Sequence, residues 1–484
     1  MNKAITPDLP VAIIGAGPVG LAAAAHLIVR GIEPLILERG TSVGATLLEW
    51  AHVRVFSPWS FNIDKAARSL LEKAGWSAPD AAGLPTGGEL VGDYLSPLAA
   101  LPSVAPHLRL GAEVTAITRE GLDKISSTGR ERAAFIVRYL DRDGSVHQAR
   151  ARAVIDASGT WTRPNPIGVD GLPVKGEPQA AGYIAYGIPD VLHAERETYA
   201  GKRVLVVGGG HSAINAALAL LSLQEAAPGT KVFWALRRNR IDRLLGGGLN
   251  DQLPERGALG LAAKKAIDEG RLEMLAPFSV EQVEQKEAYL RVAARLDGEP
   301  HALDVDRIIV ATGFRPDLSF LGELRVSLDP VVEAPPALAP LIDPNFHSCG
   351  TVPPHGIAEL VHPEPGFTIV GSKSYGRAPT FLMATGYEQV RSVVAELAGD
   401  AKAAREVQLV LPETGVCSAD YPTGAGADSA RSGCCGGPAS ETVDACCVAD
   451  AAAKTAGLGG CGCGSASRSA EKQTVQSKAL ETTE

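Results

Sequence analysis

Apolar positions in this chain gather in short blocks that stop at glycine. Residues 11–14 (VAII) stop at the segment GAGPVG, and residues 19–30 are mostly apolar and rich in alanine. A short continuous apolar run predicts a strand buried on both faces, and a longer one predicts a buried helix. Gly31 can end that helix in the left-handed conformation, and residues 35–37 (LIL) predict a second buried strand. The pattern therefore predicts a strand, a helix and a second strand near the N-terminus.

The first glycine segment has the spacing GxGxxG, and an acidic residue follows the second predicted strand. The first glycine of such a segment makes a tight turn, the second lets a pyrophosphate approach the backbone, and the third lets the helix pack on the strand. The helix N-terminus offers N–H groups to the phosphates, and the acid can accept hydrogen bonds from ribose hydroxyls. Strand, helix and acid in register predict a dinucleotide site rather than a purely structural turn. Its predicted binding residues are Gly15, Gly17, Pro18, Gly20, Glu38 and Arg39.

The same plan returns at residues 201–223 (GKRVLVVGGGHSAINAALALLSL). A strand is predicted at 204–207, and a second at 231–238 (KVFWALRR). The second strand ends in two arginines, where an NAD site would place an acid; they can pair with a 2′-phosphate, which favours NADPH over NADH. The alternative is that they are solvated surface arginines. The predicted binding residues are Gly208, Gly210, His211, Ser212, Ala213, Arg237 and Arg238.

Two dinucleotide sites in one chain suggest that one nucleotide is a prosthetic group and the other delivers a hydride to it. Two further segments, 152–160 (RAVIDASGT) and 306–317 (DRIIVATGFRPD), join a strand pattern to a turn of small residues. Each can bring the chain back across a nucleotide domain, with Gly159 and Gly313 beside the cofactors. Taken alone, each is equally well explained by an ordinary exit from a strand.

Together these segments resemble a known family. GAGPVGL with LER, GGGHSA and ATGFRPD are similar to motifs of flavoproteins with two dinucleotide-binding domains, and among them of flavin-containing monooxygenases. SPWSFNID, LPTGGEL, GTWTRPNP, SYGRAPTFLMATGYEQVRS and the cysteine-rich end resemble flavoprotein monooxygenases encoded in arsenic-resistance operons. The resemblance implies FAD at the first loop and NADPH at the second.

The resemblance also implies an α/β fold with two Rossmann-like dinucleotide-binding domains, of which the FAD domain is discontinuous. The FAD-binding domain is expected at residues 1–170 and 315–412, and the NADPH-binding domain at 171–314. A disordered cysteine-rich C-terminal tail is expected at 413–484.

The cysteine positions separate two kinds of flavoprotein chemistry. Disulfide reductases of this architecture pass electrons to a cysteine pair near the flavin, but no cysteine precedes Cys349. Oxygenation needs no such pair, because the cofactor carries the difficult step. The expected function is an FAD- and NADPH-dependent monooxygenase that works through a C4a-(hydro)peroxyflavin in arsenic or organoarsenical detoxification. The alternatives are an NADPH-dependent reductase that uses tail thiols, and a non-enzymatic metalloid-binding flavoprotein.

Position along the chain suggests which residues surround the flavin. Residues 49–62 (EWAHVRVFSPWSFN) follow the first ribose acid, where the family's chain passes the isoalloxazine; a packed loop with a structural ion pair is the alternative. A helix is predicted from about Pro379, and the resemblance implies that its positive N-terminal end points at the flavin. Thr86 is a predicted helix N-cap, and His355 either is solvated or faces the flavin cavity. The candidate flavin contacts are Trp50, Arg54, Ser57, Trp59, Tyr375 and Arg377.

The composition changes after about residue 412. Residues 413–484 hold a single aromatic residue, Tyr421, and are rich in Ala, Gly, Ser and Thr, which predicts disorder. Adjacent cysteines do not bridge each other easily, whereas thiolates favour soft centres, and three sulfurs suit trivalent arsenic. The candidate ligands are Cys434, Cys435, Cys446, Cys447, Cys461 and Cys463. An oxidisable tail without a ligand is the alternative.

Composition and charge narrow the choice of partners. The net charge of -9 argues against general binding to nucleic acid or anionic membranes, and no apolar run is long enough to span a bilayer. The N-terminus enters the first glycine segment without a signal-peptide pattern, so the cytoplasm is the expected location. The expected partners are O2 and a small-molecule substrate, with an arsenical as one candidate, and a homodimer is one candidate assembly.

Overall fold

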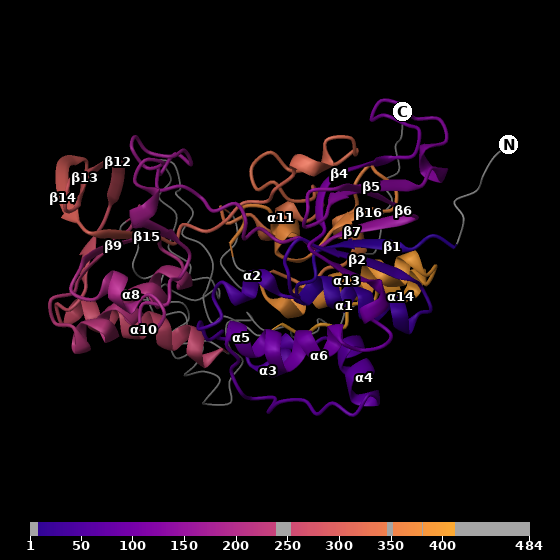
Figure 1. Cartoon of the computed structure of the whole chain (residues 1–484), viewed down its shortest axis with the longest axis horizontal. Helices are drawn as coiled ribbons and strands as arrows, with labels where there is room; N and C mark the ends of the chain where they lie inside the picture. The colour runs from indigo at the N-terminus through magenta and orange to yellow at the C-terminus, as the bar shows by residue number, and fades with distance from the viewer. Residues whose placement is uncertain (1–7, 239–252, 346–351, 380, 412–484) are drawn as a thin grey trace, which may run out of the picture. The chain divides into compact units, whose positions relative to one another are not determined.

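The computed structural model describes residues 8–238, 253–345, 352–379 and 381–411. All of them belong to the first of two compact units of the chain, Met1–Ala419; the second unit, Asp420–Glu484, lies outside the described residues. The described residues form two five-stranded parallel sheets and two three-stranded antiparallel sheets, combined with helices (Figure 1). This mixed α/β fold with parallel sheets confirms the predicted fold class, while the predicted tail falls outside the described residues.

The first parallel sheet contains the predicted strand Val11–Ile14 (β1), and its strand order is β16-β7-β1-β2-β3. The other strands are β2 (Pro34–Glu38), β3 (Leu108–Leu110), β7 (Ala153–Asp156) and β16 (Phe367–Ile369). Because β16 follows the whole second sheet in the chain, the first sheet is assembled from two separate stretches of sequence. The exact domain boundaries stay predictions.

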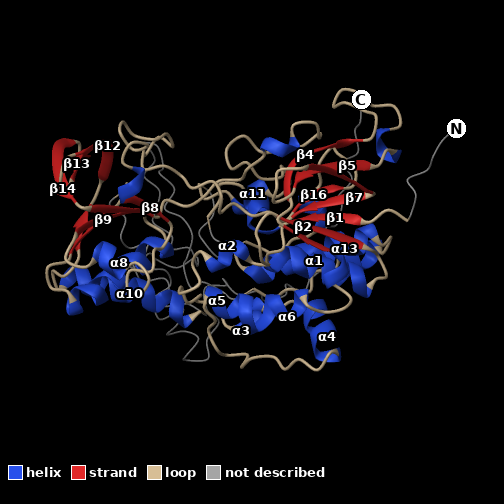
Figure 2. Ribbon diagram, in the orientation of Figure 1, coloured by secondary structure: helices blue, strands red, loops and turns tan. Residues whose placement is uncertain are grey.

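Alternate residues of β1 face two different cores. Val11 and Ile13 belong to a hydrophobic cluster with helices α1 (Pro18–Val29) and α13 (Met383–Leu397). Ala12 and Ile14 face the opposite side and pack with the antiparallel strands β4 (Glu113–Arg119), β5 (Phe135–Leu140) and β6 (Val146–Ala151). Figure 2 shows these helices and these strands on the two sides of the sheet. A strand covered on both faces has no polar side, which explains why its sequence is continuously apolar.

The second parallel sheet, with the order β11-β10-β9-β15-β8, is also covered on both faces. Its strands are β8 (Ile184–Tyr186), β9 (Arg203–Val207), β10 (Lys231–Ala235), β11 (Glu273–Leu275) and β15 (Arg307–Val310). On β9, Val204 and Val206 pack with helices α8 (His211–Ala226) and α10 (Pro254–Asp268). Leu205 and Val207 pack with the antiparallel strands β12 (Phe278–Gln285), β13 (Leu290–Leu296) and β14 (Glu299–Val305).

Short helices fill the connections. Those between β2 and β3 are α2 (Ala45–Leu48), α3 (Trp59–Asn62), α4 (Lys65–Lys73), α5 (Gly87–Glu89), the π-helical η1 (Leu90–Leu95), α6 (Ser96–Ala99) and η2 (Ala105–His107). The later ones are η3 (Arg130–Arg132), η4 (Ala181–Tyr183), α7 (Arg196–Tyr199), η6 (Ser319–Leu321), α11 (Ala339–Ile342), α12 (Ile357–Leu360), η7 (Gly371–Tyr375) and α14 (Ala401–Arg405). Within the described part of the chain, no helix is both long and apolar enough to cross a membrane.

The prediction that Thr86 caps a helix is confirmed. Its Oγ1 accepts a hydrogen bond from the Glu89 N–H at 3.1 Å, and Glu89 Oε2 accepts one from the Thr86 N–H at 2.7 Å. This reciprocal capping box begins α5.

The prediction of a helix from about Pro379 is wrong, because α13 begins at Met383. Leu382 still has an extended backbone, and the ring of Phe381 packs edge-on against Tyr375 with centroids 5.2 Å apart. Gly376, at φ 57°, lies so close to Val332 that a Cβ there would meet the Val332 carbonyl oxygen at 2.0 Å. Residues on either side of Pro379 therefore make tertiary contacts before α13 begins, and the local sequence does not reveal these contacts.

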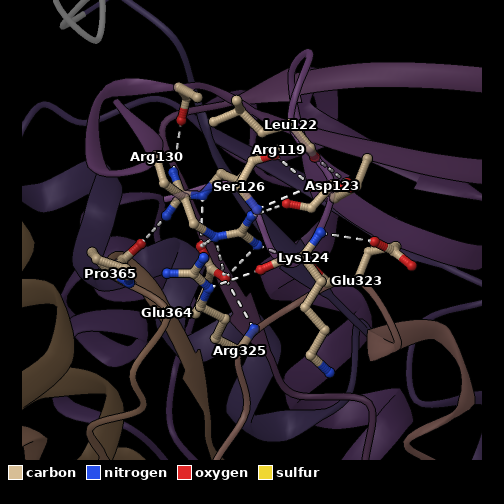
Figure 3. Close-up of polar contacts among 12 residues, drawn as sticks. Arg119, Leu122, Asp123, Lys124, Ser126, Arg130, Glu323, Arg325, Glu364 and Pro365 are labelled. Atoms are coloured by element: carbon tan, nitrogen blue, oxygen red, sulfur yellow. Dashed lines mark hydrogen bonds and ion pairs between the residues drawn. The ribbon is translucent and has the colours of Figure 1, made fainter. Parts of the chain in front are cut away.

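A buried ion-pair cluster ties the antiparallel strands β4 and β5 to the segment that returns to the first sheet (Figure 3). Glu364 is 1% exposed and lies shortly before β16. Arg119 Nε donates to its Oε1 at 2.8 Å, and Arg130 Nη2 donates to its Oε2 at 2.7 Å. The Arg325 backbone N–H donates to the same Oε2 at 3.0 Å. One carboxylate therefore joins three segments that are distant in the sequence.

Candidate functional site

The first glycine loop lies between β1 and α1 and has the shape of a phosphate cradle. Gly15 adopts φ 98°, and a Cβ on Gly20 would meet the Gly15 carbonyl oxygen at 2.0 Å, so the turn and the helix-strand contact both require glycine. A Cβ on Gly17 would meet no protein atom within 4 Å, so open space lies in front of it. Gly17 is the N-cap of α1, Pro18 begins the helix, and no side chain caps its N-terminus. The residues present therefore fit a bound pyrophosphate.

Glu38, the predicted ribose-binding acid, lies next to the first glycine loop. Glu38 Oε2 accepts a hydrogen bond from the Ala16 N–H at 2.7 Å, and Oε1 accepts one from the Gly40 N–H at 2.6 Å. These bonds fix the carboxylate at the end of β2, and each oxygen retains a lone pair for a ribose hydroxyl. The predicted contact of Glu38 with ribose stays a prediction.

A recess of about 330 Å³ opens beside Arg39, directly after this acid. In its wall Trp161 stacks on Phe314 with centroids 4.4 Å apart, and the Trp161 indole N–H donates to Glu49 Oε2 at 2.6 Å. The full lining is Arg39, Glu49, Trp161, Thr162, Pro164, Tyr186 and Phe314. A planar group bound in this recess would contact the aromatic side chains of Trp161 and Phe314. Trp161 and Phe314 were not predicted as site residues, although GTW and ATGF in the sequence place aromatic residues just after the two predicted small-residue turns.

The second glycine loop lies between β9 and α8 and repeats the geometry of the first. Gly208 has φ 138°, and a Cβ on it would meet the Ala311 carbonyl oxygen at 2.3 Å, while a Cβ on Gly210 would meet nothing within 4 Å. Trp234 on β10 donates from Nε1 to the Gly208 carbonyl at 2.8 Å and fixes the loop. The remaining predicted residues are the first three of α8, namely His211, Ser212 and the fully buried Ala213.

Phe56 and Arg256, which were not among the predicted site residues, lie near the second glycine loop. The ring of Phe56 is 5.2 Å from that of His211, centroid to centroid. The guanidinium carbon of Arg256, near the start of α10, is 5.8 Å from the centroid of the same Phe56 ring. Phe56 belongs to the segment 49–62 that the sequence places near the flavin, so this segment also contacts the second nucleotide loop. No local motif marks Arg256, and only the fold brings it there.

Arg237 and Arg238 lie just beyond β10, which ends at Ala235 and not at residue 238 as predicted. Leu236, the residue after the strand, still makes backbone hydrogen bonds: its N–H donates to the Leu275 carbonyl at 2.9 Å, and its carbonyl accepts from the Phe278 N–H at 2.8 Å. Both arginines are exposed. Their position at the carboxyl edge of the sheet suits an anionic group on the second nucleotide.

The turns after β7 and β15 hold the other two predicted glycines. Gly159 has φ 69° and lies next to Ser372, since a Cβ on it would be 3.6 Å from the Ser372 Oγ. Gly313 has φ 90°, and its carbonyl accepts from the Asn165 N–H at 2.9 Å. The turn after β7 is thus brought to the turn after β16, at the edge of the sheet where the first glycine loop lies.

The candidates of segment 49–62 occupy different environments. Trp50 is half-buried, and a Cβ on Gly87 would meet its ring at 2.8 Å. Arg54 is largely exposed, donates to the Leu84 carbonyl, and lies 3.7 Å from a Glu89 carboxylate oxygen. Ser57 Oγ donates to Asn62 Oδ1 at 3.1 Å. Trp59 is 5% exposed in the core with α1. These contacts match the alternative of a packed loop, and a role beside flavin stays a prediction for all four.

The candidates after β16 lie in and beyond the helical turn η7. Tyr375 is 2% exposed, and burial raises the pKa of its phenol, which is therefore neutral. Arg377 pairs with Glu333 at 2.9 Å and is partly exposed. Lys373, which lies two residues before Tyr375, is fully buried and donates from Nζ to Asp156 Oδ2 at 2.7 Å. This pair ties the turn after β16 to the end of β7.

All eight cysteines, including the six candidate ligands and Cys349, lie outside the described residues. Among the residues that the structure does describe, no group of three or more His, Cys, Asp or Glu side chains could hold a metal ion. The proposal of soft-metalloid ligands therefore rests on the sequence alone.

Comparison with known proteins agrees with this geometry. The family model of pyridine nucleotide-disulphide oxidoreductases matches residues 9–331. A ferredoxin–NADP reductase from Gluconacetobacter diazotrophicus is 29% identical over 324 residues, which cover 66% of this chain and 76% of that protein. Two solved structures align over most of the chain. Bacillithiol disulfide reductase Bdr from Bacillus cereus has a TM-score of 0.59 and 20% identity over 81% of this chain and 99% of its own. Ornithine N-hydroxylase from Kutzneria sp. 744 has a TM-score of 0.55 and 16% identity over 82% of this chain and 100% of its own.

The chain therefore belongs to the pyridine nucleotide-disulphide oxidoreductase family. It is a flavin-dependent pyridine-nucleotide oxidoreductase, and its cofactors are FAD and NAD(P)H. The two solved structures share its fold, and since one is a reductase and the other a hydroxylase, the fold serves both reactions.

Proposed function

We propose that this protein is an FAD- and NADPH-dependent monooxygenase. The observation that carries the proposal is the distribution of cysteine: Cys349 is the only cysteine before Cys417, so the sequence of the two predicted nucleotide-binding domains contains no thiol pair for electron transfer. The resemblance of segments such as SPWSFNID and GTWTRPNP to arsenic-operon monooxygenases supports oxygenation.

The helical turn η7 after β16, in which residues 373–375 are buried, suits oxygen chemistry. When bound, FAD reduced by NADPH supplies the reaction with O2. Tyr375 is neutral, and Lys373 is paired with Asp156, so the turn after β16 presents no free charge to a reactive intermediate. The positive N-terminal end of α13, which follows this turn, favours negative charge on a group bound beside it.

We further propose a trivalent arsenical as the substrate, and the tail cysteines as the groups that capture it. Two adjacent-cysteine pairs and the CxC at 461–463 supply enough thiols for a three-sulfur site. In the reaction two electrons come from NADPH, one atom of O2 is bonded to arsenic as it is oxidised from the trivalent to the pentavalent state, and the other atom leaves as water. Such a reaction belongs in the cytoplasm, where thiols stay reduced.

Oxygenation predicts that NADPH oxidation depends on both O2 and the arsenical. We expect a trivalent arsenical to accelerate NADPH oxidation in air by at least about tenfold, with label from ¹⁸O2 in the pentavalent product. In a matched variant with serine at the six candidate cysteines, we expect the KM for the arsenical to rise while kcat at saturation is unchanged, because capture and not chemistry is lost. Unaccelerated NADPH oxidation with stoichiometric hydrogen peroxide would contradict oxygenation.

The second candidate function is a reductase, and the ferredoxin–NADP reductase relative favours it. That relative is named for a reaction between ferredoxin and NADP, and the similarity covers 66% of this chain. The same assay distinguishes the two functions when O2 is removed. Rapid anaerobic NADPH oxidation by a one-electron acceptor such as ferricyanide, with no effect of the arsenical in air, would select the reductase.

The choice of NADPH over NADH is expected to depend on the two exposed arginines after β10. Replacing Arg237 and Arg238 by serine should lower the ratio of kcat/KM for NADPH to that for NADH by about 10- to 100-fold, because charge-assisted bonds to a 2′-phosphate are lost. Arg295→Ser, which removes an exposed arginine of β13, is the control and should leave the ratio unchanged. A wild-type ratio near one would show that the arginines are ordinary surface residues.

A further inference from the structure

A chain of buried hydrogen bonds links the turn after β16 to the segment before α12. Its central residue is Gln389, which is fully buried on α13. Gln389 Oε1 accepts from the Gly371 N–H at 2.7 Å, and its Nε2 lies 2.9 Å from Ser374 Oγ and 2.9 Å from His355 Nε2. His355 is 2% exposed, and its Nδ1 lies 3.0 Å from the Pro353 carbonyl oxygen. The sequence left His355 either solvated or facing the flavin cavity, and the structure shows that it is not solvated.

The groups at the two ends of this hydrogen-bond network, the Pro353 carbonyl and the Gly371 N–H, determine which partner donates in each bond. The Pro353 carbonyl can only accept, so Nδ1 of His355 carries the proton and Nε2 is the acceptor. The Gly371 N–H can only donate, so Gln389 presents its oxygen there and its amide hydrogens to Ser374 and His355. Ser374 in turn donates to the Gly371 carbonyl at 2.7 Å. Each donor in this network therefore has an acceptor, but only while His355 is neutral.

The turn held by this chain lies against the site of FAD. Gly371 begins η7, and a Cβ on it would be 3.4 Å from Val19, in the first turn of the phosphate-binding helix α1. Gly386, one residue beyond the first turn of α13, approaches Val19 still more closely, since a Cβ on it would be 2.5 Å from Val19 Cγ2. A shift of the Gly371 turn would therefore change its packing against Val19 at the N-terminus of α1.

Protonation of His355 is incompatible with this arrangement. A proton on Nε2 would face the amide hydrogens of Gln389, and the conflict is relieved only if the amide reverses. The reversed amide would then present its NH2 group to the Gly371 N–H, which would lose its acceptor inside the protein. A buried donor without an acceptor is costly, so the turn would have to move or the proton would have to leave.

We propose that Gln389 is a positioning residue for the FAD-side turn at 371–375, and that His355 and Gln389 form an acid-sensitive latch that holds this turn while His355 is neutral and releases it when His355 is protonated. The latch concerns FAD binding and does not depend on whether the enzyme is an oxygenase or a reductase.

The groups that face His355 determine its titration. Burial lowers the pKa of His355 below its ordinary value of 6.5, and the Pro353 carbonyl, Glu359 of α12 and Glu388 of α13 oppose that shift. Glu388 is paired with Arg391 at 2.6 Å, and the ring centroid of the neutral Tyr375 lies 5.7 Å from that of His355. Because the folded-state pKa is lowered, the latch is closed above pH 6.5 and opens as the pH falls below that value.

The test measures the rate of FAD release from the holoenzyme, followed by flavin fluorescence, together with the unfolding midpoint of the apoprotein. In the wild type we expect release to accelerate by about tenfold between about pH 7.5 and about pH 5.5, since one pKa unit corresponds to a tenfold change. His355→Gln, which can place an amide oxygen where Nε2 stands, should abolish most of this acceleration. Gln389→Glu should reverse it, because a carboxylate accepts from Gly371 and from protonated His355 at once.

The matched control is His362→Gln. Burial also lowers the pKa of His362, but its Nδ1 contacts the Ser327 carbonyl at 3.1 Å and it lies outside the Gln389 chain, so the acid acceleration should remain. An unchanged pH dependence in His355→Gln would overturn the latch. If His355→Gln loses FAD at every pH, the Gln389→Glu variant decides: a reversed pH dependence supports the latch, and a wild-type pH dependence overturns it.

Discussion

Gly17→Val is expected to yield a folded protein that has lost FAD. A Cβ at Gly17 meets no protein atom within 4 Å, and the backbone there (φ -79°, ψ -174°) is open to any residue, so the fold tolerates the side chain. The valine would stand in the space that the pyrophosphate needs. We expect FAD affinity to fall by at least about 100-fold, or about 3 kcal/mol, while the unfolding midpoint of the apoprotein stays close to that of the wild type.

Gly20→Ala is the contrasting variant. Its methyl group would overlap the Gly15 carbonyl oxygen, because the Cβ position lies 2.0 Å from it, and α1 would have to move away from β1. Here both the apoprotein midpoint and FAD affinity should fall. Calorimetry with FAD and thermal unfolding of the apoprotein separate the two effects. Tight FAD binding by Gly17→Val would show that the first loop is not the phosphate site.

Glu364→Gln is expected to be strongly destabilising. It would leave Arg119 and Arg130, each 2% exposed, without the carboxylate that neutralises them (Figure 3). Removing one partner of a buried ion pair costs about 3–5 kcal/mol, because the remaining charge is uncompensated. Urea unfolding followed by circular dichroism should show a clearly lower midpoint.

The control for this variant is Glu120→Gln. Glu120 pairs with Arg150 at 2.7 Å, the same distance as Glu364 with Arg130, but its two side chains are about half exposed. An exposed pair contributes at most about 1 kcal/mol, so the midpoint should barely move. Equal shifts in the two variants would mean that burial does not set the strength of the Glu364 cluster.

The Glu364 cluster also has a defined acid sensitivity. Burial raises the pKa of Glu364, but the hydrogen bonds from Arg130, Arg325 and Arg119 outweigh burial and hold the pKa below its ordinary value of 4.5. The stabilisation is therefore complete above pH 4.5 and is lost as the pH falls further. The stabilisation by Glu364 thus begins to be lost below pH 4.5, whereas the His355 latch begins to open below pH 6.5.

The sequence by itself determined the two nucleotide loops. GxGxxG after a short apolar run fixes a local geometry, since only glycine allows φ 98° at Gly15 and the close contact at Gly20. The continuous apolar character of VAII and VLVV also revealed strands covered on both faces, because such strands have no polar side. The absence of cysteine before Cys349, visible without any structure, is the observation on which the proposed oxygenation rests.

Only the tertiary structure decided the surroundings of these loops. The helix predicted from about Pro379 begins at Met383, and Gly376, shortly before it, packs against Val332, which is distant in sequence. Three contacts join residues that are separated by more than thirty positions: His355 with Gln389, Lys373 with Asp156, and Phe56 with Arg256. The local pattern of apolar and polar residues does not predict such contacts. Loop conformation follows from a few residue types, whereas the partners of a buried polar side chain are set by the packing of whole elements.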